Sequence, residues 1–287
     1  MLPVLLNFGF VKIYTMGVFL VLAFFWASFV LWKVIRLSSY KEGDVFDMLF
    51  GGILSGLFFG RLVYVIMNFG DFGFNILRFI LINGYPGLSL YGAIIGFILS
   101  LLLSSYLRKI VFTNLVDYYI PSSFLAVAIG KLGSFFSGSE AGLKTTFLLS
   151  VRYGGLAGAR HLTPLYEALF FFAGAAIAYR LLFEIRREKY RSGFTLSFFA
   201  WYTGAVYFIF DNLKQDHLYF LGYSFNKIMS GVLLLTFSFY FVYYFRSHII
   251  KQATEFKSLI FTYVKNTYQV VHRKTKKTAG EPKTTNS

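Results

Sequence analysis

Seven apolar runs, each long enough to cross a lipid bilayer, dominate this sequence and restrict what it can fold into. The runs cover residues 13–35, 45–69, 88–107, 119–137, 163–183, 193–213 and 226–245. A helix needs about 17–25 mostly apolar residues to span the hydrocarbon core of a bilayer, and every run meets that length. We therefore predict an all-α membrane protein with about seven transmembrane helices.

The composition agrees with a bilayer as the solvent. The chain is 56% hydrophobic and 14% charged, whereas soluble domains are roughly 45–50% apolar and about 25% charged. It contains no Cys, which excludes disulfides, a thiolate nucleophile of its own and thiolate metal sites. The sequence also lacks the His and Cys spacings of a metal site, so we expect no metal and no cofactor.

The distribution of Lys and Arg predicts the orientation, because cytoplasmic loops carry an excess of these residues. Basic residues collect after the first, third, fifth and seventh runs, at Lys33, Arg36, Lys41, Arg108, Lys109, Arg186, Arg187, Lys189, Arg191 and beyond Arg246. We expect the N-terminus outside and the C-terminus in the cytoplasm. Residues 1–245 then form one membrane domain, and residues 246–287 form a basic tail that is partly amphipathic and then disordered. A shorter apolar piece, residues 72–81, is predicted to be interfacial or re-entrant.

Ionisable side chains at membrane depth are costly and are functional candidates for that reason. With the predicted orientation, the polar and ionisable residues of five different runs all fall in the outer half of the membrane. These residues are Arg61, Tyr91, Lys131, Tyr166, Glu167, Tyr207, Asp211 and Lys214. Agreement in depth favours a site that opens to the outer leaflet. A purely structural alternative stays open, in which Glu167 and Asp211 neutralise Arg61 and Lys131 in buried pairs.

Two helical patterns refine this picture. Tyr207, Asp211 and Lys214 are spaced to share one face of a helix, which we predict to be a wall of the site. Glycines recur every fourth residue in the second run and twice in the third, ending beside Arg61 and following Tyr91. This spacing predicts a close approach of the two helices.

Several segments, in order along the chain, resemble one known family. The segments are IYTMG at 13–17, FGRLVYV at 59–65, GLSLYGAIIG at 87–96, VDYYIPSSFLAVAIGKLGSFFSGSEAG at 116–142, RHLTPLYE at 160–167 and YFIFDNLKQD at 207–216. Together they resemble the bacterial prolipoprotein diacylglyceryl transferases. The chain resembles a divergent member, because Lys131, Tyr207 and Lys214 stand at family Arg positions, Ser134 at an Asn and Asp211 at a Glu. Tyr91 stands where some members have His.

The resemblance implies transfer of the diacylglyceryl group from phosphatidylglycerol to the lipobox cysteine of a secreted lipoprotein precursor. The expected place is the outer face of the bacterial inner membrane, and the expected partners are phosphatidylglycerol, prolipoprotein signal peptides and membrane lipid, with the enzyme a monomer. The expected catalytic residues are Tyr91, Lys131, Asp211 and His161, with Asp211 or His161 as the proton acceptor. The expected substrate-binding residues are Arg61, Tyr64, Ser134, Glu140, Tyr166, Glu167, Tyr207 and Lys214.

Two alternatives to this function stay open. A catalytically silent relative would bind lipid or lipoprotein without transferring anything, and a seven-helix receptor or transporter is a further alternative. Nucleic acid is not an expected partner despite the net charge of +15, because the basic residues flank apolar runs and do not form a groove-reading stripe.

Overall fold

The computed structural model describes residues 2–9, 12–81, 84–153, 156–215, 217–220, 222–247, 250–251 and 254. The chain divides into two compact units, Met1–Phe237 and Ser238–Ser287. The features below belong to the first unit, except the last turns of α9, which fall in the second. The predicted basic tail, residues 246–287, lies almost entirely outside the described residues.

Each of the seven apolar runs contains one long helix. The helices are α1 (Thr15–Ile35), α2 (Glu42–Met67), α5 (Leu90–Leu107), α6 (Phe112–Ser137), α7 (Thr163–Arg186), α8 (Phe194–Phe210) and α9 (Phe225–Tyr244). In the described part of the chain, six of them are long and apolar enough to cross a membrane. The shortest, α8, has 17 residues and continues as a single 3-10 turn, η1 (Asp211–Leu213). The chain is thus a mostly helical, multi-pass membrane protein, and a seventh crossing by α8 stays a prediction.

Most helix boundaries lie within three residues of the predicted runs, and two of the differences bear on the site. Helix α6 begins at Phe112, seven residues before the apolar run, because polar residues lower the hydropathy there without preventing helical hydrogen bonds. One of them, Asp117, accepts hydrogen bonds from the backbone N–H groups of Gly193 (2.7 Å) and Thr195 (3.2 Å). The second difference is the early end of α8 at Phe210.

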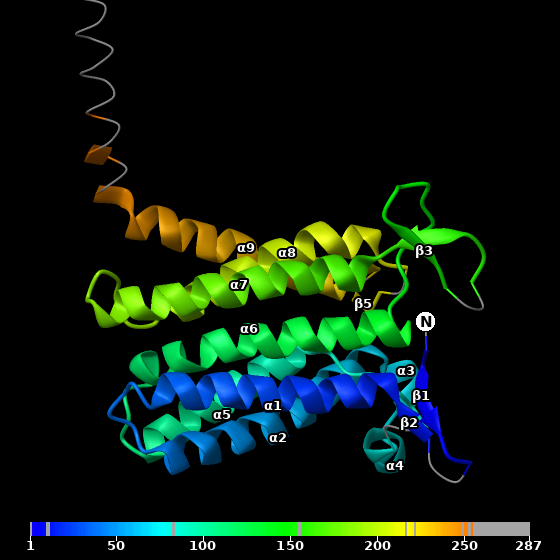
Figure 1. Cartoon of the computed structure of the whole chain (residues 1–287), viewed down its shortest axis with the longest axis horizontal. Helices are drawn as coiled ribbons and strands as arrows, with labels where there is room; N and C mark the ends of the chain where they lie inside the picture. The colour runs from blue at the N-terminus through cyan, green and yellow to red at the C-terminus, as the bar shows by residue number, and fades with distance from the viewer. Residues whose placement is uncertain are drawn as a thin grey trace, which may run out of the picture. The chain divides into compact units, whose positions relative to one another are not determined.

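Helix α6 lies between α1 and α7, and α2 packs along α5 (Figure 1). The α2–α5 contact depends on the glycines. A Cβ atom on Gly92 would lie 2.7 Å from the carbonyl oxygen of Phe59, and one on Gly96 would lie 2.6 Å from that of Ser55. No side chain fits at such distances, so the predicted close approach of these two helices is confirmed.

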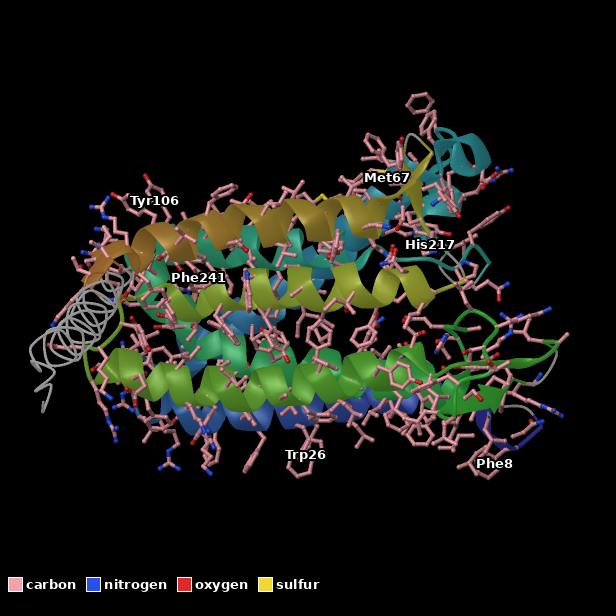
Figure 2. The ribbon with its side chains drawn as sticks, turned by 90° about the horizontal axis from the view of Figure 1, so that it is seen from above. Phe8, Trp26, Met67, Tyr106, His217 and Phe241 are labelled. Carbon is pink, nitrogen blue, oxygen red and sulfur yellow. The ribbon has the colours of Figure 1, made fainter. Side chains whose placement is uncertain are left out.

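Aromatic side chains fill the space between α6, α7 and α8. The ring of Phe124 lies 6.1 Å from that of Phe171, 4.8 Å from that of Phe199 and 5.5 Å from that of Tyr202, distances typical of favourable aromatic pairs. Other large apolar side chains face outward, as a bilayer solvent requires. Trp26, which projects from the bundle in Figure 2, is 49% exposed.

One end of the bundle carries the short elements (Figure 1). They are the hairpins β1 (Val4–Asn7) with β2 (Lys12–Tyr14), β3 (Ser150–Arg152) with β4 (Ala159–His161) and β5 (Tyr219–Phe220) with β6 (Tyr223–Ser224), and the helices α3 (Phe69–Phe72) and α4 (Ile76–Ile80). Phe8 and His217 mark this end in Figure 2, and Tyr106 marks the opposite one.

Candidate active site

A cavity of about 210 Å³ opens at the end of the bundle that carries the hairpins. Its walls come from α2, α5, α6, α8, α9 and the loops that follow α6 and α8. The lining residues are Tyr64, Leu88, Ser89, Leu90, Tyr91, Lys131, Ser139, Glu140, Ala141, Tyr207, Lys214, Leu218 and Asn226. Six of these were expected in the site from the sequence, namely Tyr64, Tyr91, Lys131, Glu140, Tyr207 and Lys214.

Two lysines and two glutamates form one ion-pair network at this cavity. The Nζ atom of Lys131 lies 2.9 and 2.8 Å from the two carboxylate oxygens of Glu140 and 2.8 Å from Oε2 of Glu167. The Nζ atom of Lys214 lies 2.7 Å from Oε1 of Glu167 and 3.6 Å from Oε2 of Glu140. The two positive and two negative charges balance, which is the condition under which charges are tolerated at such depth.

The two glutamates differ in their exposure. Glu167, in α7, is fully buried, whereas the side chain of Glu140, in the loop after α6, is 35% exposed. Burial opposes the ionisation of Glu140, but the ammonium groups of Lys131 and Lys214 outweigh it and lower the pKa of Glu140 to about 2. Ser134 also donates a hydrogen bond to this carboxylate at 3.1 Å. Glu140 is therefore ionised and open to the cavity, while Glu167 is the fully buried carboxylate of the network.

Tyr207 provides a neutral surface beside both cations. The Nζ atoms of Lys131 and Lys214 lie 5.5 and 5.1 Å from the centroid of its ring, within the range of a cation–π contact. Tyr207 is 3% exposed, and its hydroxyl has no hydrogen-bond partner among the described residues. A buried hydroxyl without a partner is costly, so this one is available to a ligand in the cavity.

Tyr91 packs against Tyr207, with the two ring centroids 6.0 Å apart. Its hydroxyl shares a hydrogen bond of 2.5 Å with Oγ of Ser230, which comes from α9. Ser230 was not among the site residues expected from the sequence. The pattern that could have indicated it is its position one helical turn after Asn226, as a polar residue near the start of an otherwise apolar run.

Arg61 does not line the cavity. Its guanidinium donates hydrogen bonds to the backbone carbonyls of Phe79 (2.9 Å), Gly87 (2.9 Å) and Arg78 (2.7 Å), and it lies 4.9 Å from the ring of Phe72. Arg61 is 2% exposed. It thus holds the short apolar segment around α4 against α2. Among the described residues, the alternative of buried charge pairs is therefore wrong for Arg61, whereas Lys131 does pair with Glu167.

Asp211 also turns away from the cavity. Because α8 ends one residue earlier, the predicted helical face through Tyr207, Asp211 and Lys214 is wrong. Asp211 instead accepts a hydrogen bond from Ser224 at 2.7 Å and lies 3.5 Å from Nδ1 of His217. Sequence reasoning missed His217, whose signal was its position three residues after Lys214 in the same loop.

The remaining predicted residues lie around the 138–162 loop and do not line the cavity. His161 is the last residue of β4, and its ring packs against that of Phe147, with the two centroids 6.2 Å apart. Tyr166 donates a hydrogen bond of 2.6 Å to the carbonyl of Leu149. Both therefore support the loop.

Fold and site together define a multi-pass membrane protein with a charge-balanced polar cavity at one end of its helical bundle. The model of the family described as prolipoprotein diacylglyceryl transferase matches residues 3–243. The chain belongs to this family, whose members are transferases of lipoprotein biosynthesis.

Relatives with the name phosphatidylglycerol–prolipoprotein diacylglyceryl transferase agree with this assignment. The protein of Listeria innocua is 29% identical over 246 residues, which cover 81% of this chain and 86% of the relative. That of Clostridium tetani is 29% identical over 221 residues, covering 75% and 86%. That of Finegoldia magna is 24% identical over 205 residues, covering 71% and 79%.

Proposed function

We propose that this protein transfers the diacylglyceryl group of phosphatidylglycerol to the lipobox cysteine thiol of a prolipoprotein. The observation that carries the proposal is that Lys131, Lys214 and Glu140 form one ion-pair cluster in the wall of a cavity. Lys131 and Lys214 stand at positions where the family resemblance expects arginine. The named relatives support the choice of both substrates.

The proposed step forms one bond and breaks one. The cysteine sulfur attacks the glyceryl carbon that carries the phosphate, a carbon–sulfur bond forms, and the carbon–oxygen bond to phosphate breaks. The electron pair leaves with glycerol phosphate, and the thiol proton passes to a base. Because a thiol has a pKa near 8.5 and reacts as its thiolate, the site has to accept that proton and stabilise the departing phosphate.

Lys131 and Lys214 are the proposed phosphate ligands. Each would exchange Glu140 for a phosphate oxygen while keeping Glu167, because Glu140 is the more exposed of the two carboxylates. Loss of its ammonium partners removes the cause of the low pKa of Glu140. Glu140 would then become basic enough to accept the thiol proton, so binding the lipid would also prepare the base. We prefer Glu140 to Asp211 and His161 as the acceptor because only Glu140 lines the cavity.

The neutral side chains complete the proposed site. The free hydroxyl of Tyr207 would donate a hydrogen bond to the phosphate. Tyr91, fixed by Ser230, would orient the incoming thiol, and Ser134 would hold Glu140 until the lipid arrives.

The proposed orientation directs the cavity to the outer face of the bacterial inner membrane. The basic residues of the connections at the other end of the bundle support a cytoplasmic position for that end. The proposal therefore keeps the N-terminus outside, seven crossings and a cytoplasmic tail.

One observation favours the silent relative as a second candidate. Both ammonium groups already have carboxylate partners, and Tyr207 adds no charge where the resemblance expects a guanidinium. Such a cavity would bind a lipid headgroup weakly and stabilise its departure less.

Complementation separates the two candidates. The gene would be expressed in a bacterial strain depleted of its own transferase, and the mass of a reporter lipoprotein would be measured directly. Growth together with the mass of one added diacylglyceryl group supports transfer. Unmodified precursor, with the protein present in the membrane at normal amounts, would favour the silent relative.

A further inference from the structure

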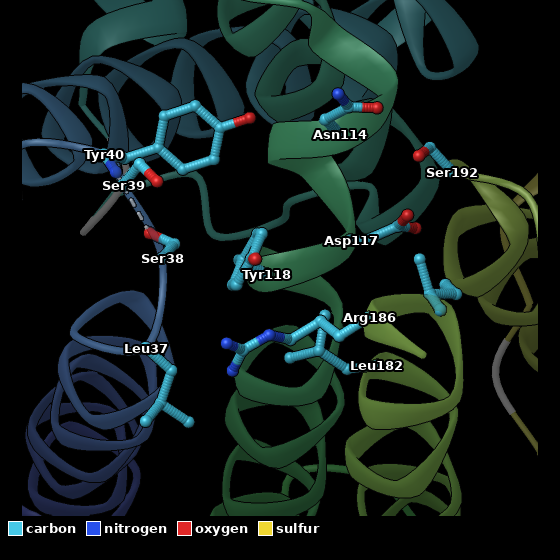
Figure 3. Close-up of a pocket in the computed structure, with 11 residues that line it drawn as sticks. Leu37, Ser38, Ser39, Tyr40, Asn114, Asp117, Tyr118, Leu182, Arg186 and Ser192 are labelled. Atoms are coloured by element: carbon cyan, nitrogen blue, oxygen red, sulfur yellow. Dashed lines mark hydrogen bonds between the residues drawn. The ribbon is translucent and has the colours of Figure 1, made fainter. Parts of the chain in front are cut away.

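A second cavity, of about 400 Å³, lies between the α1–α2 connection, the start of α6 and the end of α7 (Figure 3). Asp117 lines it and Lys131 lines the first cavity. These residues are separated by 14 positions on one helix, which at 1.5 Å per residue is about 21 Å. The second cavity is therefore a separate site at the opposite end of the bundle.

The walls of this cavity combine apolar and hydrogen-bonding groups. Leu37 and Leu182 supply apolar surface, while Tyr40, Tyr118 and Asn114 supply hydroxyl and amide groups (Figure 3). Within the described residues, the side chains of these three polar residues make no hydrogen bond. Burial and the neighbouring Tyr118 and Asp117 raise the pKa of Tyr40, so its hydroxyl stays a donor at physiological pH.

The carboxylate in the cavity, that of Asp117, already has hydrogen-bond partners within the protein. Asp117 accepts hydrogen bonds from the backbone N–H groups of Gly193 and Thr195 and from the Thr195 hydroxyl, at the start of α8. It acts there as a helix cap supplied from another helix. Its charge is thus balanced by the first turn of α8.

Arg186 contributes a positive charge to the cavity that has no ion-pair partner among the described residues. Two acidic residues, Glu184 and Glu188, lie two positions from Arg186 in the sequence. Glu184 pairs instead with Arg187 (3.5 Å) and Lys189 (2.5 Å). The described residues include no ion-pair partner for Arg186, and its guanidinium extends toward Leu37 and Tyr118 in Figure 3. One unpaired guanidinium beside neutral donors is suited to a phosphate group.

The depth of the cavity indicates where such a phosphate comes from. The cavity lies where α1 ends at Ile35 and α7 ends at Arg186, which is the level at which a membrane helix passes from hydrocarbon to headgroups. Basic pockets between helix ends on the cytoplasmic side are known binding places for anionic headgroups. We propose that this cavity binds the phosphate headgroup of an anionic phospholipid of the inner leaflet, with Arg186 as the main phosphate ligand. The site is separate from the proposed transfer reaction, and its assignment to the inner leaflet rests on the orientation proposed above.

The absence of Cys from the chain allows a direct test. Ser39 is exposed and lines the cavity, so Ser39→Cys introduces a single thiol there. Its alkylation by a small charged maleimide would be followed in nanodiscs of phosphatidylcholine alone, in nanodiscs with phosphatidylglycerol, and in phosphatidylcholine nanodiscs with inorganic phosphate. The same measurements would be made with Arg186→Ala and, as a matched loss of one charge, with Arg187→Ala.

Phosphatidylglycerol should slow the alkylation, and Arg186→Ala should weaken the apparent lipid affinity by about fivefold, the effect of one cation near an anionic headgroup. Arg187→Ala should keep the protection. Equal alkylation in both lipids would overturn the proposal, as would equal effects of the two arginine variants, which would indicate surface charge alone. Protection by inorganic phosphate in phosphatidylcholine nanodiscs would overturn the assignment to lipid and identify a soluble phosphate ester as the ligand. The same alkylation series with Ser192→Cys in place of Ser39→Cys, at the other side of the cavity, should show the same protection, and protection of Ser39→Cys alone would contradict a ligand that fills the cavity.

Discussion

The ammonium group of Lys214 lies 2.7 Å from the carboxylate of Glu167, a side chain with no exposed surface. Lys214 follows η1 and Glu167 begins the second turn of α7, so this contact joins two elements that do not adjoin in sequence. The stability of the site end of the bundle therefore depends on a pair that water cannot replace.

Glu167→Gln is expected to lower the free energy of unfolding by about 3 kcal/mol, because two buried ammonium groups then share the single carboxylate of Glu140 and the charges no longer balance. Glu140→Gln should cost about 1 kcal/mol or less, since water reaches a third of this side chain and can replace the lost partner. Chemical unfolding in detergent micelles would measure both variants. Equal losses of unfolding free energy would contradict the role of Glu167 as the buried carboxylate that stabilises the network.

Arg61→Lys is expected to destabilise the protein as well as abolish transfer. One ammonium group cannot reach the three carbonyls that the guanidinium bonds, and a lost charged hydrogen bond is worth about 1.5–3 kcal/mol. Arg78→Lys is the control, because Arg78 bonds only one carbonyl by its side chain in the described part of the chain. Loss of transfer by Arg61→Lys with an unchanged melting temperature would contradict this role and indicate direct contact with substrate.

Tyr207→Arg is expected to raise the transfer rate. A guanidinium between Lys131 and Lys214 would give the cluster a net positive charge and add a charged hydrogen bond to phosphate, worth about 1.5–3 kcal/mol. Lys214→Ala should then harm the wild type more than it harms Tyr207→Arg, because two cations that serve one phosphate are partly redundant. Transfer rates of the four proteins form a double-mutant cycle, and strictly additive effects would contradict a shared phosphate.

A reporter fused after Ser287 is expected to be cytoplasmic. The basic residues after the first, third, fifth and seventh runs all favour the inside. An odd number of crossings, such as the predicted seven, is needed to bring the C-terminus there from an outer N-terminus. A fusion after Tyr190, in the α7–α8 connection, should give the same result. A periplasmic signal from the terminal fusion alone would remove one crossing, and α8 would then be the first candidate.

The helices were predictable from the sequence because each has to satisfy its own backbone in a medium without water. Length and apolarity therefore located all seven of them. The start of α6 was missed because Asn114 and Asp117 reduce hydropathy while their side chains line a polar cavity. The hairpins were missed because strands of two to four residues carry no periodicity that a sequence can reveal.

The site was predictable in depth but not in direction. Position along a helix places Lys131, Glu167 and Tyr207 at one level, and the structure brings these three together. Position along a helix does not determine which way a side chain points around the helix axis. Arg61, at a similar level, points instead to backbone carbonyls within residues 78–87. The direction of the Asp211 side chain depends on the residue at which α8 ends, and apolar periodicity does not define that residue.

Transfer by the purified protein tests the central claim most directly. The protein would be incubated with labelled phosphatidylglycerol and a lipobox peptide, and the thioether product would be identified by mass. We predict transfer by the wild type, none by Lys131→Ala, and retained or faster transfer by Lys131→Arg, whose planar fork adds phosphate contacts without removing charge. Normal transfer by Lys131→Ala would contradict the account and reduce Lys131 to a counter-ion of Glu140 and Glu167.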